Sequence, residues 1–350
     1  MSRLHILFAL PLVVTLAGCN SNKPTGTAAA GGDRPKVGFV SNNAFDFWTY
    51  AQAGCATAAG ENGVDCIFKK PDPGDAAVQK QIIDDLVNQG VKAIAVSVID
   101  PTNQTGDLDA VASKVSLVTV DNDAPKSKRL CYIGTNNYAA GREVGKLVKQ
   151  AMPDGGTLCV FVGQMEALNA RQRRQGMLDE LAAKSAPGDI NAIESTPDGQ
   201  DYGKYKLHRT YTDQASGNKA TDNASDALIA LAGEKNLCLV GLWAYNPPAI
   251  LNAAKKQNKL GQVKIVGFDE DDETLQGVSA GHIVATVVQD PYHFGTEAVK
   301  LMAKLAKGTQ FTGDPIHYVP HRVVTKDGNN GTVAVAKFRE ELFGYKRSAR

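Results

Sequence analysis

Short apolar runs rich in β-branched residues alternate with longer segments of helical periodicity along most of the chain. Some runs, such as Ala93–Val96, are apolar at every position, which is typical of parallel strands covered by helices on both faces. The first half therefore predicts alternating strands and helices. In chain order these are strand 36–40, helix 48–62, strand 64–68, helix 76–89, strand 93–98, helix 103–113, strand 117–120, strand 132–134 and helix 138–152.

The alternation then restarts at residue 157. The second series comprises strand 157–162, helix 170–184, a strand near 206–211, helix 218–231, strand 237–241, helix 247–257, strand 264–266, helix 273–280, strand 283–288 and helix 293–307. Two consecutive series of this kind predict an α/β protein made of two doubly wound parallel-sheet lobes. Residues 187–203 interrupt the rhythm, and we interpret them as a surface insertion of unassigned role.

The first 18 residues have the organisation of a secretory signal peptide. Arg3 precedes the apolar run Ile6–Leu16, and two small residues follow it. The run is shorter than the roughly 20 residues that a spanning helix needs, but it suits a signal sequence. Residues 19–34 are small and polar without periodicity, and they predict a flexible tether.

The end of this leader, Leu16-Ala17-Gly18-Cys19, resembles a bacterial lipobox. The resemblance implies cleavage before Cys19 and attachment of lipid to its sulfur. Several acyl chains anchor a protein stably to a bilayer where one chain does not. We therefore expect an exported lipoprotein of the periplasm or cell-envelope membrane, with the choice between inner and outer membrane left open.

Charge and cysteine usage narrow the function classes. The chain has 38 Lys+Arg against 37 Asp+Glu, and removal of residues 1–18 takes away one base and leaves 37 of each. This balance gives no reason to expect a nucleic-acid partner. Beyond Cys19 the cysteines are odd in number and form no CxxC pair, so we expect no metal and no cofactor. They are Cys55, Cys66, Cys131, Cys159 and Cys238; a Cys55–Cys66 disulfide and small buried thiols are both open.

The segment Gly277–Gly281 matches the GxSxG pattern of hydrolases. A nucleophile elbow has a strand before this motif and a helix after it, whereas here the predicted order is the reverse. No Walker A, GxGxxG or HExxH sequence occurs. We therefore predict that the protein is not an enzyme.

Polar and aromatic residues gather where predicted strands end, which is where doubly wound sheets bind ligands. Aromatic faces stack on sugar rings, carboxylates accept hydrogen bonds from hydroxyls, and amides and guanidinium groups donate. This mixture suits a neutral polyol. The alternative interpretation of Phe47 and Trp48 is that they are core residues at the start of a helix. The candidate ligand-binding residues are Ser41, Asn43, Phe47, Trp48, Asp121, Asn122, Arg173, Trp243, Asn246, Asp269 and Gln289.

The segment from about residue 36 to 325 resembles the type I periplasmic sugar-binding proteins of the ribose-binding group. The matching motifs, in order, are VGFVSNNAFDFW, LVTVDNDA, YIGTNNYAAGREVG, ARQRRQGM, KIVGFDED and VATVVQDPYHFGTEAVKLMAKLAKG. The resemblance implies two lobes that close on a sugar about a three-segment hinge. The expected lobes are residues 35–135 with 290–316, and residues 136–289 with 317–345.

The resemblance also implies roles for single residues. Phe47 and Trp48 match the stacking pair, and Ser41 the serine after the first strand. The other matches are Asp121 and Asp269 to the sugar-binding aspartates, Arg173 to the arginine and Gln289 to the hinge glutamine. The family's second-lobe asparagine falls on Tyr245 or Asn246, and we prefer Asn246 on chemistry.

Departures from the family pattern leave the sugar open. Asn122 stands where ribose binders have an arginine. The second-lobe phenylalanine is replaced near Asp213-Gln214, which leaves Trp243 or Tyr245 as substitutes. Ribose itself is therefore not predicted.

Together these features predict a lipid-anchored, monomeric extracytoplasmic receptor. It is expected to bind a neutral monosaccharide or polyol between closing lobes and to deliver it to the ABC permease subunits of the inner membrane. The alternative is a sensor lobe that presents a sugar or autoinducer to a membrane kinase or chemoreceptor.

Overall fold

The computed structural model describes Met1, residues 34–329 and residues 331–348. The chain from Arg34 onward forms one compact unit. The predicted signal peptide after Met1, the predicted tether before Arg34 and Cys19, the predicted lipidation site, lie outside the described residues. In the described part, no helix is both long enough and apolar enough to cross a membrane.

The first sheet is built from the amino-terminal series of elements. Among the described residues it has six strands in the order β12-β5-β4-β3-β1-β2, and every neighbouring pair is parallel. The strands are β1 (Lys36–Val40), β2 (Asp65–Lys69), β3 (Ala93–Val96), β4 (Ser116–Val120), β5 (Cys131–Gly134) and β12 (Ile316–Tyr318).

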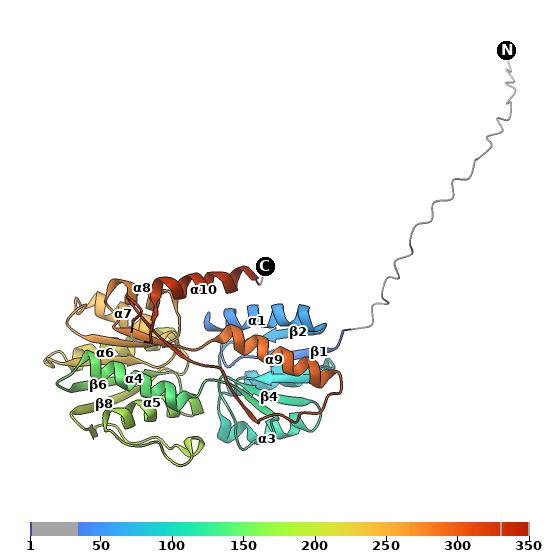
Figure 1. The fold of residues 1–350 in the computed structure, drawn as a ribbon, viewed down its shortest axis with the longest axis horizontal. Coiled ribbons are helices and arrows are strands. Elements are labelled where there is room, and N and C mark those ends of the chain that lie inside the picture. The colour runs from blue at the N-terminus through green and yellow to red at the C-terminus, as the bar shows by residue number, and fades with distance from the viewer. Residues whose placement is uncertain (2–33, 330, 349–350) are drawn as a thin grey trace. The chain divides into compact units, whose positions relative to one another are not determined.

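Helices cover both faces of this sheet. On one face α1 (Phe47–Asn62) packs against α9 (Pro291–Ala306), as Figure 1 shows. The other face carries α2 (Ala76–Asn88) and α3 (Pro101–Ala112). Burial on both sides explains why β3 reads as an uninterrupted apolar run.

The second sheet has eight strands within the described residues, in the order β14-β13-β11-β10-β9-β6-β8-β7. Its five central strands pair in parallel, whereas β13 and β7 run antiparallel to their inner neighbours. The strands are β6 (Gly156–Val162), β7 (Asp201–Tyr202), β8 (Tyr205–Thr212), β9 (Leu237–Gly241), β10 (Lys264–Phe268), β11 (Ala285–Val288), β13 (Arg322–Thr325) and β14 (Val333–Ala334).

This sheet is likewise covered on both faces (Figure 1). One face carries α4 (Asn137–Ala151) and α5 (Leu168–Leu181). The other carries α6 (Gly217–Ala230), α7 (Asn246–Lys256), α8 (Asp272–Ala280) and α10 (Val335–Ser348). The predicted architecture of two doubly wound α/β lobes is confirmed.

Within residues 34–329 the chain passes between the sheets three times, after β5, after β11 and after β12. The third passage corrects an expected boundary. The expected division between residues 316 and 317 falls inside β12, whose three residues all pair with β5. Because a strand enters a sheet through its whole hydrogen-bonded ladder, the passage follows Tyr318.

Two helix starts position loops at the strand ends. At the starts of α3 and α9, an aspartate side chain accepts hydrogen bonds from backbone N–H groups of the first turn, and a proline follows the aspartate. The second of these pairs, Asp290-Pro291, comes directly after Gln289. The start of α9 therefore fixes the backbone beside a predicted ligand-binding residue.

The interruption at residues 187–203 is ordered into a short 3₁₀ helix (Ile190–Ala192) and the edge strand β7. Arg174 on α5 holds it by donating to Thr196 and Asp198. All five cysteines in the described part are thiols: Cys55, Cys66, Cys131, Cys159 and Cys238. The open choice between a Cys55–Cys66 disulfide and separate thiols thus resolves to thiols in this structure.

Candidate functional site

Asp121 and Asp269 occupy equivalent places in the two sheets, directly after β4 and β10. Both are buried, and both adopt left-handed backbone angles, with φ of 60° and 68°. Aspartate is one of the few residues other than glycine that tolerate this region. Each sheet therefore turns sharply at a strand end while still presenting a carboxylate.

Arg173, on α5, lies between these carboxylates and is 1% exposed. Its Nη2 is 3.9 Å from Asp121 Oδ1, and its Nη1 is 3.9 Å from Asp269 Oδ2. Its Nε donates to Asn137 Oδ1 at 2.8 Å, and its Nη1 donates to the Leu242 carbonyl at 2.9 Å. The guanidinium is thus held near both acids, at ion-pair distance rather than hydrogen-bond distance.

One oxygen of each aspartate is held by the protein. Asp121 Oδ2 accepts from Ser97 Oγ at 2.9 Å, and Asp269 Oδ1 accepts from Gln289 Nε2 at 2.9 Å. Burial raises the pKa of Asp121, and it raises the pKa of Asp269 to about 7, in each case against the opposing effect of Arg173. Hydrogen-bond donors from a ligand would stabilise the charged form of both carboxylates.

These groups line a narrow cleft of about 30 Å³ between the two sheets. That volume holds roughly two water molecules, so a monosaccharide requires the walls to separate. Eight of the predicted residues line the cleft: Asn43, Phe47, Trp48, Asp121, Arg173, Trp243, Asp269 and Gln289.

Four polar atoms of cleft-lining residues are buried and make no hydrogen bond in the described part of the chain. They are two donors, Arg173 Nη2 and Trp243 Nε1, and two acceptors, Asn169 Oδ1 and Gln289 Oε1. Buried polar atoms without a partner are rare because each loses its hydrogen bonds to water. Their gathering around one cleft matches a ligand that both donates and accepts, as a polyol does.

The aromatic wall of the cleft is continuous with the core. Trp48 is 1% exposed, packs against Phe39 and Phe47, and donates from Nε1 to Asn42 Oδ1 at 3.1 Å. Phe47 is partly exposed and meets the Trp48 ring edge-on, with centroids 5.1 Å apart. The two readings of this pair are thus compatible, since Trp48 belongs to the core and also lines the cleft.

Three predicted residues do not line this cleft. Ser41 donates from Oγ to the Asn43 carbonyl at 2.6 Å and so shapes the loop after β1. Asn122 donates to the Val98 carbonyl, and its Oδ1 accepts from the backbone N–H of Asn169 at 2.9 Å, which links the two lobes. Both side chains are therefore occupied by backbone groups.

The third is Asn246, and Tyr245 lines the cleft in its place. Asn246 donates to Asp213 Oδ2 at 2.9 Å, and its Oδ1 accepts from the Trp243 N–H at 3.0 Å. Both polar ends of Asn246 thus hold the turn that leads into α7. Our preference for Asn246 rested on its chemistry, but its side chain is held within the turn and does not line the cleft.

Tyr245, which the sequence left as an alternative to Asn246, lines the cleft, and so do four residues that we did not predict: Asn42, Phe45, Asn169 and Ala244. Asn169 lies four residues before Arg173 on α5, so the two share one face of that helix. That spacing is a signal in the sequence that could have identified Asn169. The loop 41–48 predicted the region of Asn42 and Phe45 but not which of its side chains face inward.

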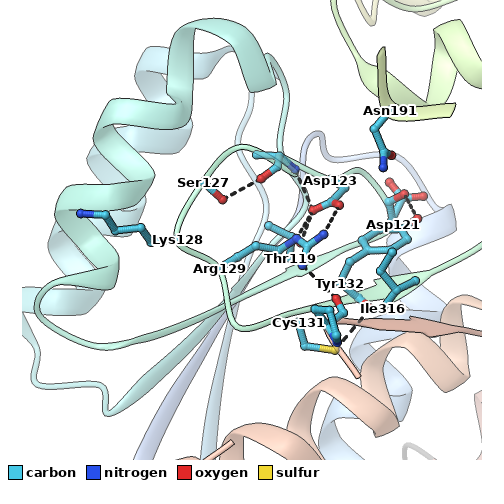
Figure 2. Close-up of polar contacts among 12 residues, drawn as sticks. Thr119, Asp121, Asp123, Ser127, Lys128, Arg129, Cys131, Tyr132, Asn191 and Ile316 are labelled. Atoms are coloured by element: carbon cyan, nitrogen blue, oxygen red, sulfur yellow. Dashed lines mark hydrogen bonds and ion pairs between the residues drawn. The ribbon is translucent and has the colours of Figure 1, made fainter. Parts of the chain in front are cut away.

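Figure 2 shows the surroundings of Asp121. Tyr132 donates from its hydroxyl to the Asp121 carbonyl at 2.8 Å and so supports the left-handed turn. Asp123, two residues further on, is paired with Arg129 through two contacts of 2.6 Å, and the side chains of both are 8% exposed. The carboxylate of Asp123 is thereby engaged within the first lobe.

The cleft lies at strand ends that two lobes present to one another, and a family comparison agrees with this arrangement. The profile of the periplasmic binding protein domain matches residues 37–310. The chain belongs to the periplasmic binding protein family. The type I fold expected from the sequence motifs is thereby confirmed.

Two relatives and one solved structure illustrate the similarity. The ribose import binding protein of Haemophilus influenzae is 27% identical, over 67% of this chain and 73% of its own length. The D-allose-binding periplasmic protein of Escherichia coli is 25% identical, over 75% and 81%. An ABC transporter solute-binding protein from Burkholderia graminis, solved in complex with D-arabinose, has a TM-score of 0.75 at 25% identity, covering 85% of this chain and 98% of its own. These proteins are named for binding, in agreement with the prediction of a non-enzyme.

Proposed function

We propose that this protein is an exported receptor that binds a neutral monosaccharide or polyol in the cleft and delivers it to an ABC-type uptake permease. The observation that carries the proposal is the set of four unpartnered buried polar atoms between two strand-end aspartates. The sugar-binding relatives and the family match support it.

In this proposal the ligand completes hydrogen bonds that the protein leaves open. Asp121 and Asp269 accept from sugar hydroxyls, and Arg173 donates from Nη2. Phe47 and Trp48 stack on the C–H face of the ring. Each lobe supplies only some of these contacts, so the full set forms only when both lobes meet the sugar.

Closure of the lobes follows from this division of partners. Because each sheet supplies part of the polar lining, the sugar stabilises the arrangement in which both parts meet. The cleft of about 30 Å³ implies that the lobes separate to admit a sugar. The three passages between the sheets form the hinge in this proposal.

The amino terminus supports export and lipid anchoring. An apolar run too short to span a membrane ends in Leu16-Ala17-Gly18-Cys19. We expect mature protein to partition into detergent, and we expect Cys19→Ala to release it into the soluble fraction. A wild-type protein that stays soluble without lipid, as judged by mass spectrometry, contradicts the anchor and leaves the sugar proposal intact.

The central test is to titrate the protein with a panel of neutral pentoses, hexoses and polyols and to monitor binding by tryptophan fluorescence. Trp48 and Trp243 both line the cleft, so ligand entry is expected to change their emission. A saturable response to one member of the panel supports the proposal. Absence of a response across the panel, repeated by calorimetry, overturns it.

Delivery is tested by uptake of the sugar so identified. Cells without this receptor are expected to lose high-affinity uptake and to recover it with wild-type protein but not with Asp121→Ala. Unchanged uptake without the receptor contradicts the permease partnership.

A further inference from the structure

A second, larger cavity lies beside the cleft. Its volume is about 410 Å³, and it shares Phe45, Phe47, Ala244 and Tyr245 with the cleft lining. The two spaces are therefore neighbours separated by the same side chains. Nothing in the proposed sugar contacts makes use of this second cavity.

Its lining is strongly acidic. Four carboxylates contribute to it: Asp46, Glu270, Asp271 and Asp272. Asp46 comes from the loop before α1, whereas the other three follow β10. Carboxylates from both lobes thus face one space, which favours a positively charged occupant.

Glu270 sets this cavity apart from an ordinary acidic surface. It is 2% exposed, yet neither Oε1 nor Oε2 accepts a hydrogen bond in the described part of the chain. Burial raises the pKa of Glu270 well above its usual range, and Asp269 and Asp290 add to the effect. A buried carboxylate without donors is costly. Its two oxygens are covered in this arrangement, so a ligand donor pairs with them when the lobes separate at this cavity.

Two arginines near Glu270 in the described part of the chain are committed elsewhere. Arg322 donates to Glu341 at 2.6 Å, and Arg173 donates to Asn137 and to the Leu242 carbonyl. Both lie close enough to lower the pKa of Glu270 through space, but neither donates to it. The described residues therefore leave the hydrogen-bonding capacity of Glu270 unused.

The remaining lining distinguishes an organic cation from a metal ion. Phe45, Phe47, Tyr50 and Tyr245 contribute aromatic rings, which attract ammonium groups through their faces. No group of three or more metal-ligating side chains is assembled among the residues that the structure describes. A cavity of about 410 Å³ also suits a small molecule better than a bare ion.

We propose that this cavity is an ammonium-binding subsite, in which Glu270 accepts a hydrogen bond from the primary ammonium group of a small amine or of an amino-substituted sugar. Asp46 and Asp271 contribute negative charge from different lobes. The second source, an amino sugar that reaches from the cleft into the cavity, rests on the proposed sugar-binding function. The first source does not.

The test is calorimetry on the mature wild-type protein with ethanolammonium chloride as the free amine and with D-glucosamine compared with D-glucose. Saturable binding of ethanolammonium identifies a free amine as the ligand. Binding of glucosamine at least about tenfold tighter than that of glucose, without ethanolammonium binding, identifies an amino sugar. If neither amine probe binds, the subsite is overturned.

Variants localise the binding. Glu270→Gln keeps the shape of the side chain and removes its charge. If ethanolammonium binds wild type, we expect the variant to bind it at least about tenfold more weakly. If only glucosamine binds, we expect the ratio of glucosamine affinity to glucose affinity to fall by the same factor. Asp46→Asn, on the opposite lobe, is expected to reduce it in the same direction and serves if Glu270→Gln fails to fold. Glu273→Gln is the matched control, because Glu273 lies three residues away and outside the lining. Equal amine affinity in wild type and both lining variants overturns the proposal.

Two further outcomes are decisive. Displacement of the amine by millimolar calcium chloride indicates a metal site and overturns the proposal. Ethanolammonium binding that depends on Glu270, in a protein that binds no neutral sugar, supports the subsite while the sugar proposal fails. The two proposals are thereby tested separately.

Discussion

The ring of Phe45 stacks on the ring of Tyr245, with centroids 4.1 Å apart and planes inclined by 18°. Phe45 lies in the loop after β1 and Tyr245 in the loop after β9, so the contact joins the two lobes across the cleft. The Tyr245 hydroxyl donates to Asp213 Oδ1 at 2.5 Å, which orients its ring. The pair therefore acts as an aromatic latch on the arrangement in which the lobes meet.

Removal of the latch is expected to favour opening. A stacked aromatic pair contributes about 0.5–1.5 kcal/mol beyond its buried area, so Phe45→Ala should weaken sugar binding about 2- to 10-fold, mainly through faster release. Stopped-flow fluorescence measures the release rate. Ile229→Ala, at a side chain that is 67% exposed, is the control and should leave the rate unchanged. An unaltered rate in Phe45→Ala contradicts the latch.

Truncation of Asp121 is expected to affect binding more strongly. The change leaves Arg173 without one of its two nearby carboxylates and removes an acceptor for the sugar. Because loss of one member of a buried charged pair costs about 2–5 kcal/mol, Asp121→Ala should weaken binding about 30-fold or more. Calorimetry measures the affinity, and circular dichroism checks the fold. Asp154→Ala, at an exposed position, should bind as wild type does. Equal affinity in Asp121→Ala argues against the site.

The stability of the ligand-free protein is expected to depend on Asp269. Its folded pKa, about 7, lies above the ordinary value of 3.8, because burial outweighs Arg173 and the Gln289 hydrogen bond. A group with a raised folded pKa contributes stability below the unfolded pKa and loses it as pH rises through the folded pKa. The free energy of unfolding should therefore fall between about pH 4 and pH 7.

Urea unfolding at intervals from pH 4 to pH 8 measures this effect. In Asp269→Asn the free energy of unfolding should fall less between pH 4 and pH 8 than it does in wild type. The variant should also lose sugar affinity. Two acids near Asp269 also have raised pKa values: Asp121 and Glu270. The free energy of unfolding of the variant is therefore still expected to fall somewhat as pH rises. An identical pH profile in the variant contradicts the assignment.

Close packing of α4 on α5 is expected to hold Arg173 in place. A Cβ added at Gly141 would lie 2.2 Å from the Arg173 carbonyl oxygen. Gly141→Ala should therefore reduce the free energy of unfolding by about 1–3 kcal/mol and also weaken sugar binding. Gly106→Ala is the matched control, since nothing lies within 4 Å of the added atom, and a helical alanine should stabilise by about 0.5–1 kcal/mol. Normal affinity in a destabilised Gly141→Ala would show that Arg173 is positioned by other contacts.

The strand-end rule located most of the cleft from the sequence. Asp121, Asp269 and Gln289 converge because the carboxyl ends of parallel strands meet at one edge of each sheet, and Arg173 reaches them from α5. The rule does not say which of several consecutive side chains turns inward. We preferred Asn246 to Tyr245 on chemistry, but both polar ends of Asn246 are engaged by the turn into α7.

Short edge elements were also beyond the pattern. Strands β7, β12 and β14 have only two or three residues, too few to show a period. Whether they form depends on a neighbouring strand far along the chain, as β12 depends on β5. The expected lobe boundary at residue 316 was wrong for this reason.

The sequence by itself determined the alternation of strands and helices, the two-lobe architecture and the kinds of side chain at the strand ends, because apolar periodicity and turn chemistry are local properties. Only the tertiary structure decided which side chains share the cleft, that four of their polar atoms lack partners, and that Glu270 is buried beside an acidic cavity. These features depend on the left-handed turns at Asp121 and Asp269 and on contacts between segments more than a hundred residues apart. Packing through space sets them, and no local pattern encodes it.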